Sequence, residues 1–206
     1  MSNLQELKNL KAILIATNNP GKLKEIRDLL PKKIKIYKPQ DFNIKEPREN
    51  GKTFKSNAKI KSLYCAKRSK IVSISDDSGL EVKYLDNQPG IYSARWAGKN
   101  KDFKIAIKKV EKKLINKKKQ SSPANFTCCI SIAFPSGKTF EFLGKVFGKV
   151  SFPPRGKKGF GYDPIFIPKG RIKTFSELNP EIKNKISHRY QAFKKIKKYF
   201  KFNSKI

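Results

Sequence analysis

The sequence is poor in the residues that build disulfides, zinc sites and membrane spans. Its 206 residues include three cysteines and one histidine, and no two cysteines have C-x-x-C spacing. This scarcity argues against a zinc site or redox pair and is typical of a reducing compartment. No apolar run approaches the roughly 18 residues that a transmembrane helix needs. The first apolar run, Ala12–Ala16, is too short for the core of a signal peptide. We therefore expect a cytoplasmic protein without a membrane partner.

Acidic residues are also scarce: 16 of them face 48 lysines and arginines, which gives a net charge of +32. The excess is mostly lysine and is spread along the whole chain. One interpretation is a surface that associates non-specifically with nucleic acid. The other is a solvated, lysine-rich surface without a partner, which the lack of an arginine–aromatic cluster in the sequence favours. In either case the charge should attract polyphosphate anions, and salt should weaken that attraction.

The length and a hydrophobic content of 37% predict one domain over residues 1–206, with a short polar extension at 1–11. Apolar periodicity, caps and breakers predict an alternation of helices with strands, including hairpins. This order indicates an α/β fold with a mixed, twisted sheet. The expected strands are 12–16, 34–37, 71–74, 125–134, 138–143 and 165–167, with a bend or bulge near 144–148. The expected helices are 22–30, 53–69, 102–117, a short one capped by Ser176 and a last one capped by Ser187.

The first strand runs into a polar loop, Asn18–Gly21, and a helix follows from Lys22. Such a loop directs backbone N–H groups and a helix N-terminus to one point, which suits an anion. A lysine in the first turn is unfavourable for the helix dipole. A bound phosphate would account for Lys22, and so would the abundance of lysine, so both explanations stay open.

The stretch SISDDSGLEV places two carboxylates, Asp76 and Asp77, directly after an apolar strand-like run. Ser78 and Gly79 follow, and we expect them to form a turn before a second extended run. Adjacent carboxylates at the end of a strand suit Mg²⁺, which is usually held by one or two carboxylates with phosphates and water. The alternative is a polar turn without chemistry.

Two further segments carry candidate contacts. The glycine- and proline-rich stretch 151–164 cannot be regular structure, and its glycines allow the backbone to approach a ligand on which Phe160 and Tyr162 could stack. At the start of the last helix, His188 and Arg189 are both expected to reach outward. Together they offer hydrogen bonds suited to a carbonyl oxygen or a ring nitrogen.

Six motifs occur in a characteristic order: TNNPGK (17–22), ENGKTF (49–54), DDSGLEV (76–82), PGIYSARWAG (89–98), GFGYDPIF (159–166) and ISHRYQA (186–192). In this order and spacing the chain resembles the inosine triphosphate pyrophosphatase family, also called the dITP/XTP pyrophosphatase family, over residues 12–200. The resemblance implies a hydrolase that cleaves ITP, dITP and XTP between the α- and β-phosphates. The products are the nucleoside monophosphate and pyrophosphate, so deaminated purines are kept out of DNA and RNA.

The same resemblance implies a fold, a cofactor and an assembly. The fold is an elongated mixed, twisted sheet flanked by helices, in two lobes with the active site in the cleft between them. The cofactor is Mg²⁺, or Mn²⁺, with one or more ions per active site, and the assembly is a homodimer.

The resemblance also implies roles for particular residues. Asp77 would be the catalytic base, and Glu49 and Asp77 the metal ligands. His188 and Arg189 would meet the 6-keto oxygen of the base, and Phe160 would stack on its ring. The other substrate contacts would be Thr17, Asn18, Asn19, Pro20, Gly21, Lys22, Ser78, Gly161, Tyr162, Asp163 and Lys183.

Two rival functions stay open. The chain could bind nucleotides or nucleic acid without turnover, or it could be a triphosphate pyrophosphatase of the related Maf type with pyrimidine or methylated substrates. Glu49, Asp77 and Lys22 favour an enzyme over a pure binder, because a binder has no need of metal-binding carboxylates.

Overall fold

The computed structural model describes residues 10–200, so the predicted extension at 1–11 lies almost entirely outside the described residues. Seven strands form one mixed sheet, flanked by helices, which confirms the predicted α/β class. The strands are β1 (Ala12–Ile15), β2 (Lys35–Tyr37), β3 (Ser73–Val82), β4 (Gln88–Pro89), β5 (Ser121–Ala133), β6 (Thr139–Ser151) and β7 (Phe166–Pro168). The α-helices are α2 (Pro20–Leu29), α3 (Phe54–Ser69), α4 (Phe103–Asn116), α5 (Pro180–Ile186) and α6 (His188–Phe200). Short 3-10 helices are η1 (Pro39–Phe42), η2 (Lys83–Leu85), η3 (Gly90–Tyr92), η4 (Arg95–Ala97) and η5 (Asp163–Ile165).

The described residues fall into two compact units. The first comprises 10–77, 129–144 and 189–200, and the second comprises 78–128 and 145–188. Three strands, β3, β5 and β6, have residues in both units. Each unit is described separately below.

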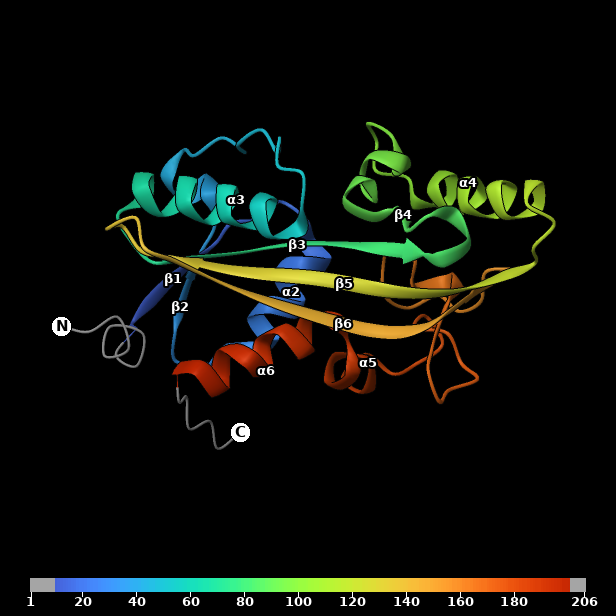
Figure 1. The fold of residues 1–206 in the computed structure, drawn as a ribbon. Helices are drawn as coiled ribbons and strands as arrows, with labels where there is room; N and C mark the ends of the chain where they lie inside the picture. The colour runs from blue at the N-terminus through green and yellow to red at the C-terminus, as the bar shows by residue number, and fades with distance from the viewer. Residues whose placement is uncertain (1–9, 201–206) are drawn as a thin grey trace. The chain divides into compact units, whose positions relative to one another are not determined.

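In the first unit the strand order is β2-β1-β3-β5-β6, and β1 runs parallel to both of its neighbours. Helix α3 covers one face of these strands, and α2 and α6 cover the other (Figure 1). A parallel strand covered on both faces must be apolar throughout, and Ile13, Leu14 and Ile15 are indeed fully buried. The continuous apolar run predicted to be a buried strand is therefore the centre of this unit.

In the second unit the order is β4-β3-β5-β6-β7, with β4 antiparallel to β3 and β7 antiparallel to β6. Helices α4 and α5 lie on opposite sides of these strands (Figure 1). The core contains a cluster of three rings, Phe126, Phe166 and Phe175. The ring centroids of Phe126 and Phe166 are 4.7 Å apart, and those of Phe166 and Phe175 are 5.1 Å apart. Aromatic pairs at this separation stabilise a core beyond their buried area.

Side-chain caps mark the starts of three helices, and the sequence correctly predicts two of these starts, those of α3 and α4. Asn19 caps α2, Thr53 caps α3 and Asp102 caps α4, each through a side-chain oxygen that accepts a backbone N–H of the first turn. Helix α2 begins at Pro20, two residues before the predicted start, because proline fits the first helical position.

Two local predictions are wrong: the turn at Asp76–Gly79 and the helix cap at Ser176. The Asp-Asp-Ser-Gly stretch is not a turn, since β3 continues through it for ten residues. Gly79 serves close approach instead: a Cβ there would lie 2.2 Å from the carbonyl oxygen of Gly90. Strand β6 is longer than the predicted 138–143 and includes Gly148, where a Cβ would lie 2.1 Å from the oxygen of Ile167. Ser176 caps no helix; α5 begins at Pro180 with Asn179 as its cap.

Among residues 10–200, no helix is both long and apolar enough to span a membrane.

Candidate functional site

In the first unit, hydrogen bonds fix the loop that joins β1 to α2. The backbone N–H of Asn19 donates to Oγ1 of Thr17 at 3.2 Å, and the backbone N–H of Lys22 donates to Oδ1 of Asn19 at 3.1 Å. The Asn18 side chain donates to Glu46 at 3.0 Å and accepts from Gln40 at 2.8 Å. The loop therefore presents the N-terminus of α2, with Pro20 and Gly21 in its first turn, in a fixed conformation suited to an anion.

Asp76 is the centre of a buried ion cluster. Its Oδ2 accepts from Nη2 of Arg189 at 2.7 Å and lies 3.4 Å from Nζ of Lys22. Arg189 also donates to Glu25 on α2. Burial opposes ionisation of Asp76, but the charges of Arg189, Lys22 and Lys61 outweigh it and hold its pKa well below the usual range. Asp76 is therefore a permanent anion that fixes Arg189.

Asp77 has a different environment from its neighbour. Its Oδ2 accepts from the Asn57 amide at 3.1 Å, and Asn57 in turn accepts the Gly51 backbone N–H at 2.8 Å. Burial, reinforced by the charge of Glu49, raises the pKa of Asp77 above its usual value. The charges of Lys22 and Lys61 oppose that rise. A carboxylate with a raised pKa is better suited to accept a proton than an ordinary one.

Glu49 lies beside Lys61, whose Nζ is 2.9 Å from Oε1 of Glu49. Among the charged groups described above, the four carboxylates of Glu25, Glu49, Asp76 and Asp77 outnumber the three cations of Lys22, Lys61 and Arg189. A residual negative charge from oxygen donors suits a hard divalent cation. Over residues 10–200 no group of three or more His, Cys, Asp or Glu side chains could enclose a metal. The donor set thus fits an ion with one or two protein carboxylates that completes its shell with phosphate and water, as Mg²⁺ does.

In the second unit, Asp163 organises the loop before β7. Its Oδ2 accepts the Phe160 N–H at 2.8 Å and pairs with Nζ of Lys183 at 2.5 Å. The same Nζ lies 4.7 Å from the centroid of the Phe160 ring. A Cβ at Gly159 would meet the Asp163 carboxylate at 2.2 Å, so glycine is required there. Phe160 is half-buried, which leaves part of its ring available for stacking on a base.

Tyr162 does not have the stacking role that its place in the loop suggested. Its side chain is buried, and its hydroxyl donates to the Ser93 carbonyl oxygen at 3.0 Å. Its ring packs edge-on against Phe103 on α4, with centroids 5.4 Å apart. Tyr162 therefore anchors the loop. The ring that is available for stacking belongs to Phe160, two residues earlier. Gly161 between them has a φ of +68°, a conformation that glycine adopts readily.

His188 and Arg189 do not reach outward, contrary to expectation, because both side chains are buried. The His188 ring stacks on Phe126 of β5, with centroids 4.9 Å apart and an angle of 15° between the planes. Arg189 belongs to the ion cluster of the first unit. The neighbouring residues thus enter different environments.

Sequence reasoning missed four residues of this arrangement as site residues: Glu25, Asn57, Lys61 and Phe126. Asn57 and Lys61 are polar residues four apart on the inner face of α3, and both are buried. Buried polar side chains on an inner helical face need hydrogen-bond or ion-pair partners, so this pair in the sequence could have indicated a site. Nothing in the sequence around Phe126 distinguishes it from an ordinary core residue.

The predicted site residues fall into two groups. The first unit holds Thr17, Asn18, Asn19, Pro20, Gly21, Lys22, Glu49, Asp77 and Arg189. The second unit holds Ser78, Phe160, Gly161, Tyr162, Asp163, Lys183 and His188.

Comparison with known proteins identifies the family. The model of the Ham1 family matches residues 13–199. A dITP/XTP pyrophosphatase of Caulobacter vibrioides is 44% identical over 185 residues, covering 90% of this chain and 95% of the relative. One of Zymomonas mobilis is also 44% identical, covering 89% of each. A solved HAM1 protein of Coxiella burnetii is similar with a TM-score of 0.84 and 35% identity, covering 93% of this chain and 99% of that one. The chain therefore belongs to the Ham1 family, which confirms the resemblance carried by its six motifs.

Proposed function

We propose that the protein hydrolyses deaminated purine nucleoside triphosphates (ITP, dITP and XTP) to the nucleoside monophosphate and pyrophosphate. The observation that carries this proposal is the cluster of Glu49, Asp77 and Lys61, two carboxylates beside a buried cation in a chain of this family. Names of the curated relatives favour this enzyme over a nucleotide binder without turnover and over a Maf-type pyrophosphatase. The protein is thus a nucleoside triphosphate pyrophosphatase that clears the nucleotide pool.

Glu49 and Asp77 are the residues that would hold Mg²⁺, or Mn²⁺. When bound, the ion offsets phosphate charge and lowers the pKa of a water molecule. Asp77 accepts a proton from the attacking water, a role that its raised pKa supports. Asn57 orients that carboxylate through its hydrogen bond. These steps need positioning and charge neutralisation rather than a covalent intermediate.

The β1–α2 loop is the proposed binding element for the phosphates. Thr17–Lys22 offers backbone N–H groups at a helix N-terminus, and Lys22 stabilises the negative charge on the departing pyrophosphate. Asp76 holds the Lys22 ammonium at 3.4 Å and thereby restricts where it lies. Ser78, the next residue of β3 after Asp77, is a further proposed substrate contact.

The purine is bound by groups of the second unit. The ring of Phe160 stacks on the base, with Lys183 held beside it by Asp163. His188 donates a hydrogen bond to the 6-keto oxygen, where adenine would present an amino group. A site built on such a bond rejects a mismatched base strongly. The buried ion pairs of Arg189 favour a positioning role over a direct contact with the base.

Three finer features complete the proposal. The resemblance supports a homodimer, which light scattering coupled to gel filtration tests by mass. Cysteine usage supports the cytoplasm as its location. The net charge of +32 supports non-specific, salt-dependent association with nucleic acid.

Product analysis tests the proposed function. ITP, XTP, GTP and ATP are incubated with the protein, with Mg²⁺ or with EDTA. We expect Mg²⁺-dependent monophosphate and pyrophosphate from ITP and XTP and little product from ATP. An Asp77→Asn variant should lose turnover while its affinity for ITP stays within about tenfold, since one hydrogen-bonding oxygen remains. Orthophosphate and the diphosphate instead would mean cleavage at the wrong bond, and full activity of Asp77→Asn would remove Asp77 as the base.

A further inference from the structure

The second unit carries a groove of about 850 Å³ that none of the proposed site residues lines. Its volume lies in the range of ligand-binding clefts. The walls come from four segments: η2 with the turn that follows it, the start of β5, the C-terminal part of β6, and β7 with the turn that follows it.

The groove is strongly cationic. Lys83, Lys149, Lys169 and Arg171 line it, and all four are exposed. Within the described part of the chain, none of these four side chains has an ion-pair partner. Asp86 is the one carboxylate of the lining, and Lys117 already pairs with it at 3.2 Å. The lining therefore presents unneutralised positive charge that favours an anionic occupant over an uncharged, apolar one.

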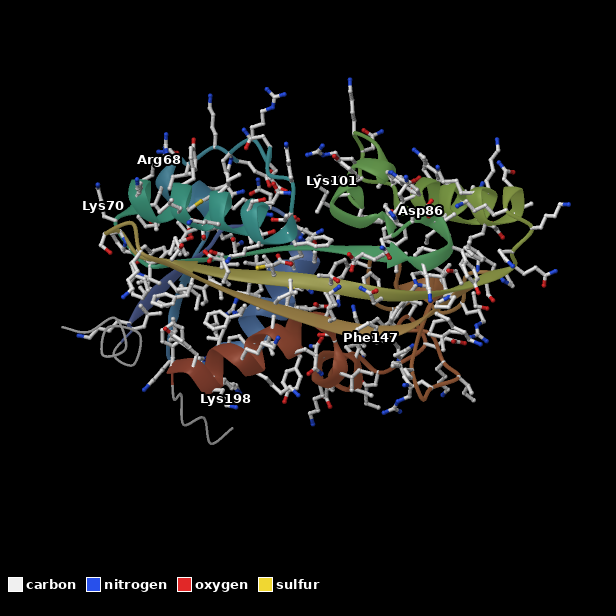
Figure 2. All side chains as sticks on the ribbon, viewed as in Figure 1. Arg68, Lys70, Asp86, Lys101, Phe147 and Lys198 are labelled. Carbon is white, nitrogen blue, oxygen red and sulfur yellow. The ribbon has the colours of Figure 1, made fainter. Side chains whose placement is uncertain are left out.

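One aromatic ring is exposed among these cations. Phe147, labelled in Figure 2, lies on β6 and is 60% exposed, and the exposed Lys149 follows two residues further along the same strand. Alternating side chains of a strand share a face, so the ring and the ammonium group point the same way. An exposed ring beside free cations offers both a stacking surface and a charge for a phosphate.

The backbone that carries these groups is held in place. Strand β7 pairs with β6 in a register that sets Ile167 opposite Lys149, and the Lys169 N–H donates to the Phe147 carbonyl oxygen at 2.9 Å. The strands approach closely at Gly148, where a side chain would collide with Ile167. The backbone positions that carry the ring and these cations are thus fixed relative to one another, which lowers the entropy lost on binding.

We propose that this groove binds single-stranded nucleic acid. The cations track the phosphodiester backbone and the Phe147 ring stacks on an unpaired base, the combination by which single strands are bound without sequence preference. A duplex keeps its bases stacked inside and cannot use the ring. This site goes beyond the proposed hydrolysis, because it takes a polymer rather than a nucleoside triphosphate and uses none of the catalytic residues.

Fluorescence anisotropy tests the groove with a fluorescein-labelled 20-nucleotide oligothymidylate and a duplex of the same length. Phe147→Ala should weaken single-strand binding by about 5- to 100-fold, the usual effect of removing one stacking ring. It should change duplex binding by less than about twofold. Phe147→Trp should keep or improve single-strand binding, because the larger ring still stacks.

A matched pair of triple variants distinguishes oligonucleotide binding in the groove from binding by the general surface charge. One carries Lys149→Ala, Lys169→Ala and Arg171→Ala, and the other carries Lys104→Ala, Lys108→Ala and Lys112→Ala on the exposed face of α4. Both remove three positive charges from the second unit. The groove variant should bind at least tenfold more weakly. The slope of log K against the logarithm of the salt concentration should fall in magnitude by about 2, since each phosphate contact on a single strand contributes about 0.7 to that slope. The α4 variant should stay within about threefold of the parent.

Three results would overturn the proposal. Equal losses of oligonucleotide affinity in the two triple variants would mean binding by diffuse charge. Unchanged single-strand binding by Phe147→Ala would mean that no base stacks on this ring. If Phe147→Ala changes the oligomeric mass but not the binding at matched protomer concentration, the groove is a contact between copies of the chain.

The groove and the proposed hydrolysis can be tested separately. Hydrolysis of ITP should be unchanged in Phe147→Ala, and Asp77→Asn should bind the oligonucleotide like the parent, so either proposal can fail without the other.

Discussion

Nζ of Lys61 lies 2.9 Å from Oε1 of Glu49, so a buried ammonium group on α3 occupies one side of a carboxylate that we propose as a metal ligand. The charges of Glu49, Asp77 and Asp76 outweigh the effect of burial and raise the pKa of Lys61 above its usual value. Lys61 therefore stays protonated and competes with any cation that binds Glu49.

Replacing Lys61 tests this competition. Lys61→Met keeps the aliphatic length and removes the charge, so Mg²⁺ should bind more tightly and the Mg²⁺ concentration for half-maximal hydrolysis should fall by about tenfold, which corresponds to about 1.4 kcal/mol. Titration of activity against Mg²⁺ measures it. Lys59→Met, an exposed lysine on the same helix, is the control and should leave the titration unchanged. A higher Mg²⁺ requirement in Lys61→Met would contradict competition and assign Lys61 to the positioning of Glu49.

Arg189→Ala should be strongly destabilising, because it leaves the buried carboxylates of Asp76 and Glu25 without their guanidinium partner. Removing one partner of a buried ion pair costs about 3–5 kcal/mol. Urea unfolding measures the loss in the free energy of unfolding. Arg68→Ala is the matched control. Arg68, labelled in Figure 2, is exposed on α3, and its guanidinium carbon lies 3.6 Å from the centroid of the Tyr64 ring. Its loss should cost less than about 1 kcal/mol. Similar costs for the two variants would contradict the buried cluster.

His188→Ala should relax the preference for ITP over ATP, measured as the ratio of the two kcat/KM values. Losing a hydrogen bond that reads a keto oxygen lowers such a ratio by about 100-fold or more. Phe126→Leu should lower it by a smaller factor, because the imidazole loses the ring on which it stacks. In that variant kcat for ITP should stay near the parent value, since the Phe126 ring packs against the rings of His188, Phe166 and Phe175, none of which is a proposed phosphate-binding residue. Selectivity that survives in His188→Ala would assign the reading of the base to another residue.

The three cysteines should be unreactive in the folded protein. All are free and buried, and burial raises the pKa of Cys65 to about 11 and that of Cys129 to about 12. Since only the thiolate reacts, at pH 8 on the order of one Cys65 thiol in a thousand is ionised. A disulfide reagent at pH 8 should therefore label no thiol within minutes in the native state and all three in denaturant. Rapid labelling without denaturant would contradict the buried positions.

Much of the fold could be predicted from local sequence signals. The apolar run at β1 and the caps Asn19, Thr53 and Asp102 act within a few residues, so their structures follow from neighbouring chemistry alone. The prediction of a turn at Asp76–Gly79 was wrong because the reason for the glycine lies in a distant segment. Gly79 allows the backbone of Gly90 to come close and does not turn the chain.

The candidate site shows the same division. Motifs indicated which residues belong to it, but not how each is used. Arg189 was expected to point outward, and its burial depends on Asp76, 113 residues away in the chain. Tyr162 was expected to stack on a ligand, and its role as an anchor depends on Ser93. Such pairings arise only when the chain is folded, so no local pattern could supply them.

The most direct test of the central claim is hydrolysis of ITP in water enriched in ¹⁸O. In the proposed mechanism, water loses its proton to Asp77 and attacks the α-phosphate, and pyrophosphate leaves toward Lys22. This puts one ¹⁸O into the nucleoside monophosphate and none into pyrophosphate. Mass spectrometry measures the ¹⁸O content of both products. Label in the monophosphate alone is the predicted result. Label in pyrophosphate or in orthophosphate would mean attack at another phosphorus and would contradict the roles given to Asp77 and Lys22.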